Sequence, residues 1–105
     1  MIIGSPGGSA IMTSLLQVFL HVAEGNLSVS EAIARPRFHH QWLPDHIMIE
    51  RENWPVELGQ SLVARGHTLD TINYLGLVKA IVKSDEAYIG CGDPRTNDHA
   101  EGLDK

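Results

Sequence analysis

A glycine pair near the start of the 105-residue chain is the feature best suited to chemistry. Gly7 and Gly8 follow a short apolar run and Pro6, and they precede Ser9, which is placed to cap a long apolar segment. The first amides of a helix lack intrahelical partners, and glycines let a ligand oxygen come close to them. The N–H groups of Gly7 and Gly8 could therefore bind an anion or a developing oxyanion. A plain sharp turn also fits a glycine pair.

Four possible metal ligands lie close together further along the chain: His39, His40, Asp45 and His46. Adjacent histidines rarely both face one ion, and this spacing matches no standard zinc site. We therefore expect no metal and no cofactor. Instead, Arg37, His39 and His40 are expected to form a hydrogen-bonded brace for an irregular loop over residues 35–45.

A second glycine-rich segment surrounds the single cysteine, in the order Gly90, Cys91, Gly92. A dinucleotide fingerprint would need a third glycine and a following helix, and neither is present. No base is identifiable by spacing that would make Cys91 a nucleophile, so we expect a small residue in a tight bend. One cysteine allows no disulfide within the chain, and its presence does not indicate a redox compartment.

These residues must be positioned by helices and strands that the hydrophobic pattern predicts. Apolar spacing and capping signals favour helices over residues 10–24, 29–34 and 56–64. Alternating apolar residues favour strands over residues 2–3, 47–50 and 67–72, and a hairpin of residues 77–83 with 87–90. In the third helix we expect Pro55 at the first helical position. The inward residues expected there are Val56, Leu62 and Val63.

The pattern predicts an α/β or α+β fold, with a mixed or antiparallel sheet of four or five strands and about three helices. No linker divides the chain, so we expect one domain over residues 1–105, with a frayed tail over residues 96–105. A net charge of −5 and eight scattered Lys and Arg residues argue against nucleic acid as a partner. The longest near-apolar run, residues 10–23, is too short to cross a bilayer, and Met1 precedes no signal-peptide pattern.

Three motifs in register give the sequence a resemblance. Residues 4–9 (GSPGGS), 34–45 (ARPRFHHQWLPD) and 92–95 (GDPR) resemble, in order and spacing, the C-terminal part of the small subunit of γ-glutamyltranspeptidases. The resemblance covers about residues 1–103. It implies part of the αββα sandwich of N-terminal-nucleophile hydrolases. It also implies the chemistry of that family, which is cleavage or transfer of γ-glutamyl groups from glutathione and related compounds.

The resemblance also implies residue roles. Gly7 and Gly8 match two family glycines that donate backbone N–H groups to the oxyanion, and Ser5 and Pro6 would shape the substrate loop. The nucleophilic threonine and the residues that grip the glutamyl group lie upstream of the matched positions. We therefore expect a piece of such an enzyme that is inactive alone and binds a γ-glutamyl substrate only together with the upstream part.

Two other interpretations remain open. The chain could be a non-catalytic binding or assembly module derived from the family, or a metal-dependent hydrolase using His39, His40 and His46. A part of a sandwich leaves apolar surface bare, so association with the remainder of the enzyme or with another copy is expected. Family members are often periplasmic or extracellular, but the sequence does not assign a compartment.

Overall fold

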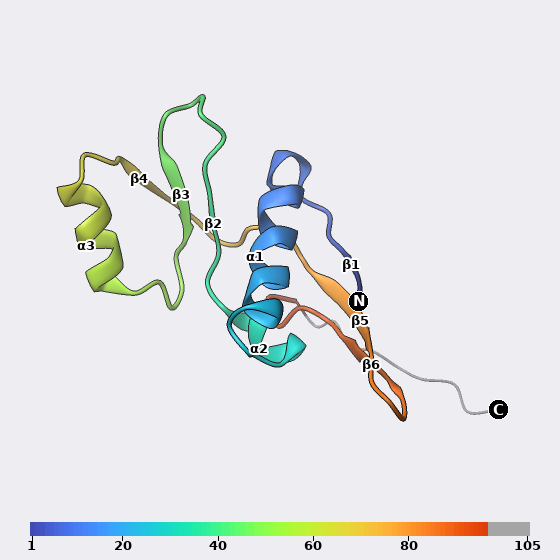
Figure 1. The fold of residues 1–105 in the computed structure, drawn as a ribbon. Helices are drawn as coiled ribbons and strands as arrows, with labels where there is room; N and C mark the ends of the chain where they lie inside the picture. Colours follow the sequence, from blue (N-terminus) through green and yellow to red (C-terminus); the bar gives the residue numbers. More distant parts are fainter. Residues whose placement is uncertain (97–105) are drawn as a thin grey trace. The chain divides into compact units, whose positions relative to one another are not determined.

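The computed structural model describes residues 1–96, and the chain packs as two compact units (Figure 1). Unit 1 combines Met1–Arg35 with the segment that begins at Gly76, and unit 2 is Pro36–Leu75. The expected single domain over residues 1–105 stays a prediction. The expected frayed tail lies outside the described residues, apart from Thr96.

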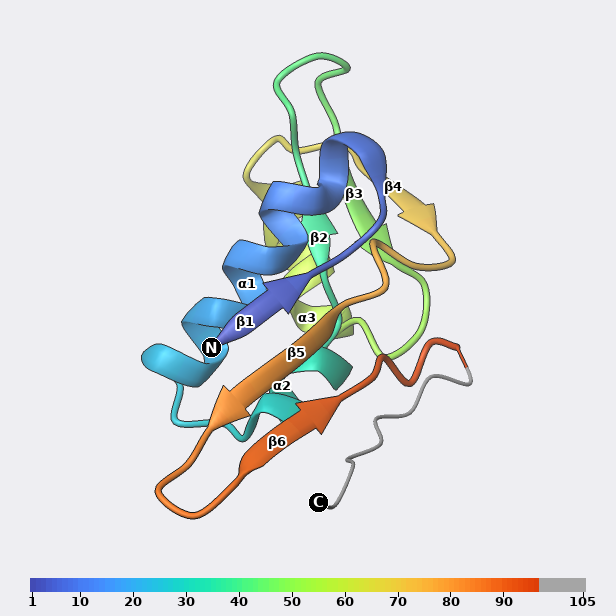
Figure 2. The ribbon, with the colours of Figure 1, turned by 90° about the vertical axis from the view of Figure 1, so that its right-hand side faces the viewer.

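Unit 1 places two helices against a three-stranded antiparallel sheet. Its elements are β1 (Ile2–Gly4), the 3-10 helix η1 (Gly8–Ala10), α1 (Ile11–Ala23), α2 (Val29–Ala34), β5 (Lys79–Lys83) and β6 (Tyr88–Cys91). The sheet order is β1-β5-β6, so Ala80 in the central strand pairs with Ile3 on one side and Cys91 on the other (Figure 2). The predicted hairpin of β5 and β6 is confirmed, and β1 completes the sheet from the far end of the chain.

The core of unit 1 lies between the helices and one face of this sheet. It consists of Val18, Val29, Ala32, Ile33, Val78 and Ala80, all buried. Strand alternation brings Val78, Ala80 and Val82 to the same face. α2 begins with the predicted Ser28 N-cap, since the Glu31 N–H donates to Ser28 Oγ at 3.2 Å. The Glu31 carboxylate accepts the Ser28 hydroxyl at 2.9 Å instead of the Ser28 backbone N–H of a full capping box.

The start of α1 differs from the expectation. Ser9 is not an N-cap, because it lies inside η1, and α1 begins after Ala10 with no side-chain cap. The positive φ angles of Gly7 and Gly8 turn the chain into a tighter 3-10 turn first, which the Ala10 N–H closes onto Gly7 O at 3.1 Å. At the other end, Gly25 follows the cap as predicted, but Asn26 has the left-handed backbone.

Unit 2 contains a mixed sheet and one helix. Its elements are β2 (Phe38–His39), β3 (Ile47–Glu50), α3 (Val56–Ala64) and β4 (Leu69–Ile72). β2 pairs antiparallel with β3, whereas β3 and β4 are parallel and are joined through α3. The α+β class with about three helices is therefore confirmed, and the six strands of residues 1–96 divide between two sheets instead of forming one.

The inward side of α3 was predicted wrongly. Val56 and Val63 are exposed, Leu62 is only half-buried, and Gly59 is the buried residue of the helix. A Cβ atom at Gly59 would lie 3.4 Å from Trp54 Nε1 and 3.6 Å from Leu69 Cδ1, so this glycine packs against both side chains. Pro55 is the N-cap and not the first helical residue.

Among residues 1–96, no helix combines the length and apolar character needed to span a membrane.

Candidate functional site

The predicted glycine turn joins β1 to α1 and lies at the surface of unit 1. Pro6, Gly7, Gly8 and Ser9 are all exposed, and Ser5 is half-buried. Gly7 has φ 140° and ψ 14°, and Gly8 has φ 57°, angles that side chains disfavour. Both positions therefore depend on glycine for their backbone conformation.

The two peptide planes of this turn are held by their carbonyl sides. Ser5 Oγ donates to Pro6 O at 2.6 Å, and the Ala10 N–H donates to Gly7 O at 3.1 Å. In a trans peptide the N–H points opposite to the C=O, so the Gly7 and Gly8 N–H groups point away from these bonds. Throughout residues 1–96, no protein group accepts a hydrogen bond from either amide.

The two N–H groups also converge. With ψ at 14°, the Gly7 and Gly8 nitrogens nearly eclipse each other about the Cα–C bond. Peptide planarity places the Gly8 hydrogen in this plane, and a φ of 140° keeps the Gly7 hydrogen on the side of the Gly8 nitrogen, although out of the plane. Both hydrogens therefore lie on the same side of the turn, where an anionic oxygen atom can approach the two N–H groups together.

A segment distant in sequence packs beneath the turn. The Leu77 N–H donates to Ser5 Oγ at 2.9 Å, and a Cβ at Gly7 would lie 3.4 Å from Gly76 Cα. Gly76 itself has φ 72°, and a Cβ there would lie 2.7 Å from Ser5 Oγ and 3.0 Å from Ser14 Oγ. From the sequence, residues 73–76 are expected to form only a linking turn. Only the glycine at position 76 signalled a close approach of backbone.

The expected brace in residues 35–45 is confirmed. Arg37 is buried and its Nε donates to Leu75 O at 2.7 Å, while its N–H donates to Glu50 Oε1 at 2.7 Å. His39 Nε2 lies 2.9 Å from Gln41 Oε1, and His40 Nε2 lies 3.2 Å from Asp45 Oδ1. These side chains hold the backbone of unit 2.

The candidate metal ligands have separate partners. His40 faces Asp45, whereas His46 Nε2 faces Asp70 Oδ2 at 3.8 Å. In the part of the chain that the structure describes, no three His, Cys, Asp or Glu side chains come together to hold an ion. The geometry thus offers no support for metal-dependent hydrolysis through His39, His40 and His46.

The third motif, residues 92–95, forms a structural clamp in unit 1. Asp93 is fully buried and accepts the Val78 N–H at 2.7 Å. Its carboxylate also pairs with Arg95 Nη1 at 3.1 Å, and Arg95 donates to Ile33 O and Arg35 O at the end of α2. This motif therefore joins the sheet to α2. Its Asp93 carboxylate is buried and bonded within unit 1, so it is not placed to bind a ligand.

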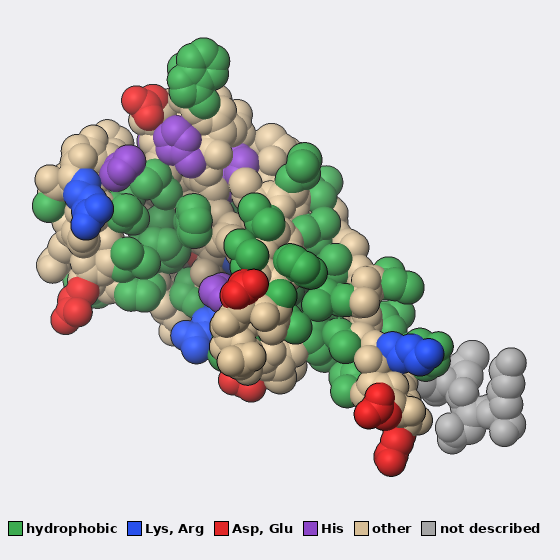
Figure 3. Space-filling model, viewed as in Figure 1, with side chains coloured by type: hydrophobic (Ala, Val, Ile, Leu, Met, Phe, Trp, Pro, Cys, Tyr) green, Lys and Arg blue, Asp and Glu red, His purple; other side chains and the backbone are tan. Residues whose placement is uncertain are grey.

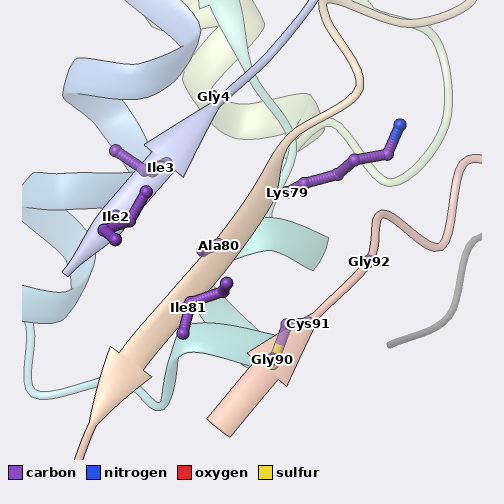
Figure 4. Close-up of a pocket in the computed structure, with 9 residues that line it drawn as sticks. All are labelled: Ile2, Ile3, Gly4, Lys79, Ala80, Ile81, Gly90, Cys91 and Gly92. Atoms are coloured by element: carbon purple, nitrogen blue, oxygen red, sulfur yellow. The ribbon is translucent and has the colours of Figure 1, made fainter. Parts of the chain in front are cut away.

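A pocket of about 360 Å³ lies over the β1-β5-β6 sheet, and its lining is mostly apolar (Figure 4). Three of the lining residues, Gly4, Gly90 and Gly92, have no side chain to fill it. Cys91 pairs with the buried Ala80 and packs against the core. The expected tight bend at Cys91 was therefore wrong, because Cys91 is the last residue of β6; within residues 1–96 no base is bonded to its thiol.

Comparisons with known proteins match nearly the whole chain. The family model described as Gamma-glutamyltranspeptidase matches residues 1–103. The glutathione hydrolase proenzyme of Escherichia coli K12 is 39% identical over 99 residues, which are 93% of this chain and 17% of that protein. The corresponding protein of Pseudomonas aeruginosa is 33% identical over 98 residues, 90% of this chain and 18% of that protein. The chain thus spans less than a fifth of these relatives.

Solved structures show the same fold. The γ-glutamyltranspeptidase from Pseudomonas nitroreducens matches with a TM-score of 0.91 and 32% identity, over 97% of this chain and 54% of that chain. The Bacillus anthracis transpeptidase CapD matches with a TM-score of 0.80 and 25% identity, over 96% of this chain and 62% of that chain. In both cases the match covers more than half, but less than two thirds, of the other chain.

Proposed function

Because the chain belongs to the γ-glutamyltranspeptidase family, we propose that it supplies the oxyanion-stabilising turn of an enzyme that transfers or hydrolyses γ-glutamyl groups. Its fold is part of the N-terminal-nucleophile hydrolase architecture, as the three motifs implied. One observation carries the proposal. The Gly7 and Gly8 N–H groups have no protein acceptor within residues 1–96, and they lie on the same side of the turn.

Acyl transfer from a γ-glutamyl compound gives this arrangement a role. When a hydroxyl nucleophile attacks the γ-glutamyl carbonyl, negative charge develops on the carbonyl oxygen. Two fixed N–H donors stabilise that charge without having to reorganise, and one such donor is worth about 10²–10³ in rate. Gly7 and Gly8 are both exposed and carry no side chain, so a substrate oxygen can approach their nitrogens.

The turn stabilises charge but contains no nucleophile. The resemblance assigns attack to a threonine upstream of the matched residues, and the substrate-gripping residues also lie there. We therefore propose that the 105-residue chain has no turnover alone, and that it binds γ-glutamyl compounds such as glutathione only when joined by that upstream part. Ser5 and Pro6 act here as the frame of the turn and not as direct substrate ligands.

Apolar surface on unit 1 supports association with the remainder of such an enzyme. On α1, Met12, Leu16, Phe19 and Leu20 are 82%, 55%, 49% and 44% exposed, and Figure 3 shows hydrophobic side chains gathered over this helix. Monomeric proteins rarely leave large contiguous apolar patches exposed. We propose that the remainder of the enzyme covers α1 and that the isolated chain self-associates. Sedimentation of the isolated chain as a monomer at high concentration would contradict the self-association.

The function can be tested by mixing the chain with a separately expressed upstream segment of the Escherichia coli relative. Release of p-nitroaniline from γ-glutamyl-p-nitroanilide measures turnover. Gly8→Val strains the positive φ of this residue and so disturbs the turn that presents both amides, and we expect it to lower turnover by about 10²-fold or more. Gly66→Val is the matched control, because Gly66 also has a positive φ and open space around it but lies in unit 2.

The outcomes separate the hypotheses. Full turnover with Gly8→Val contradicts the oxyanion role. Binding of the two segments without turnover favours the non-catalytic module. Turnover by the isolated 105-residue chain beyond that of a Gly7→Val variant contradicts the proposal that the chain is inactive alone.

A further inference from the structure

We propose that Ser5 is a positioning residue whose hydroxyl fixes the peptide between Pro6 and Gly7, so that the Gly7 N–H faces the substrate oxygen. This inference rests on the proposed oxyanion role of the turn and extends it to a side chain. Neither the glycine pair nor the capping pattern assigns such a role to Ser5. The assignment comes from three consecutive hydrogen-bonding groups in the structure.

The Ser5 hydroxyl is held on both sides. Its oxygen accepts the Leu77 N–H at 2.9 Å, and its proton goes to Pro6 O at 2.6 Å. A hydroxyl has one donor and two acceptor positions, so the bond from Leu77 leaves the O–H free to turn toward Pro6. The bond to Pro6 O then fixes the direction of the opposite end of the same peptide, the Gly7 N–H.

This peptide needs such a restraint because of its neighbours. Gly7 has no side chain to resist rotation, and a flip of the Pro6–Gly7 peptide changes only the ψ of Pro6 and the φ of Gly7. A flipped peptide would present the Pro6 carbonyl to the oxyanion and turn the N–H inward. The next peptide is restrained differently, since Gly7 O accepts the backbone N–H of Ala10. Of the side chains in residues 1–96, Ser5 alone is seen bonded to either carbonyl.

The same chain of bonds improves the donor as well as aiming it. Hydrogen bonds in series polarise one another. Donation from Leu77 to Ser5 and from Ser5 to Pro6 O withdraws electron density from the peptide whose N–H belongs to Gly7. Gly76 packs closely against this hydroxyl, since a Cβ on Gly76 would lie 2.7 Å from Ser5 Oγ. The position of the hydroxyl therefore depends on both segments of unit 1.

A pair of variants that differ only in the hydroxyl tests the inference. Ser5→Thr keeps the O–H, and Ser5→Val has the same shape without it. Ser9→Ala removes an exposed hydroxyl from the same turn and serves as the control. In NMR spectra of the 105-residue chain, Ser5→Val should move the Pro6 carbonyl carbon and Gly7 amide nitrogen signals away from their wild-type positions. It should also speed Leu77 amide exchange about tenfold. Ser5→Thr and Ser9→Ala should leave these readouts near wild type.

Turnover with the upstream segment provides the second readout. We expect Ser5→Val to lower kcat about tenfold with KM changed less than about twofold, because the hydroxyl acts through the oxyanion donor and not on bound substrate. Ser5→Thr should restore kcat. If the substitution only disturbed folding, Ser5→Thr and Ser5→Val would lower kcat to a similar extent, because their side chains have the same shape.

The two proposals fail in different ways. If Gly8→Val abolishes turnover while Ser5→Val and Ser5→Thr behave alike, the positioning role is wrong and the oxyanion role stands. If Ser5→Val moves the NMR signals but Gly8→Val keeps full turnover, the hydrogen bonds exist and the oxyanion role is wrong, which also removes the catalytic meaning of Ser5. Identical NMR spectra for Ser5→Val and Ser5→Thr at Pro6, Gly7 and Leu77 would overturn the inference directly.

Discussion

The turn over residues 5–10 and the loop over residues 40–46 both hold a backbone with positive φ angles, but their side chains bond opposite ends of the peptide group. Both contain residues with a positive φ, Gly7 and Gly8 in the turn and Trp42 in the loop. Both are held by a polar side chain, Ser5 in the turn and His40 in the loop. The turn leaves its glycine amides without protein acceptors in the described part of the chain. In the loop, the Trp42 amide is bonded to His40 Nδ1 and the Leu43 amide to Gln41 O.

The difference lies in which end of the peptide the side chain contacts. The Ser5 hydroxyl donates to a carbonyl and so turns an N–H outward. His40 Nδ1 accepts an N–H and so uses it up. When the side chain bonds the carbonyl, the N–H of the same peptide stays available to an anion. When it bonds the N–H, the backbone is held but no donor is left for a ligand. The type of anchoring side chain therefore decides whether a strained turn can receive an anion.

The largest expected effect is on stability, and it comes from removing the side chain of Glu50 in unit 2 as compared with that of Ser5 in unit 1. Glu50 is buried and accepts the N–H groups of Arg37 and Leu75 at 2.7 and 2.8 Å. Glu50→Ala leaves buried donors without their acceptor, so we expect a loss of about 3 kcal/mol in unfolding free energy. Ser5→Ala should cost only about 1 kcal/mol. Urea denaturation measures both. The exposed neighbour Glu52→Ala is the control, and an equal loss there would contradict the role of Glu50.

The second prediction concerns the segment of Gly76 and Leu77 that packs against Ser5 beneath the turn. Gly76 and Gly66 both have a positive φ, but only at Gly76 would a Cβ meet other atoms, the nearest being Ser5 Oγ at 2.7 Å. Gly66→Ala should therefore cost about 1 kcal/mol from backbone strain alone, and Gly76→Ala about 2 kcal/mol. Thermal or urea unfolding gives the comparison. Equal costs would mean that the turn yields to the new methyl group.

A smaller effect is expected in amide exchange. The Trp42 N–H donates to His40 Nδ1 at 3.0 Å, and we expect His40→Ala to speed its exchange about fivefold. His40→Asn should recover part of the protection, because an asparagine side chain can accept an amide two residues on. The Gly7 and Gly8 amides should exchange near their intrinsic rates in every variant. Strong protection of Gly7 or Gly8 would remove the contrast between turn and loop.

The smallest effect is a pH dependence in α1. Burial lowers the pKa of His21 from its usual value of 6.5, and the charge of Arg35 lowers it further. The unfolded chain therefore binds this proton more readily, so the contribution of His21 to stability decreases as the pH falls through about 6.5. The difference in Tm between wild type and His21→Gln should change in that direction between about pH 7.5 and pH 5.5. No change would show that His21 titrates as in the unfolded chain.

Local sequence signals predicted local structure well. Three of them follow from neighbouring residues and are confirmed: the Ser28 N-cap, the alternation of Val78, Ala80 and Val82, and the hairpin of β5 and β6. Signals that depend on packing failed. The inward side of α3 is set by Gly59 against Trp54, and no hydrophobic pattern marks a glycine as the buried position. The short β2 was missed because its pairing partner lies across a loop.

The sequence by itself determined the class of the fold, the family and the place of the glycine turn, because these depend on residue types and their spacing. Only the tertiary structure decided what the turn can do. Leu77 is 72 residues from Ser5 in the chain, yet its amide orients the hydroxyl that holds Pro6 O. The direction of an N–H group follows from where its carbonyl is bonded, and that partner is chosen by the folding of distant segments against each other.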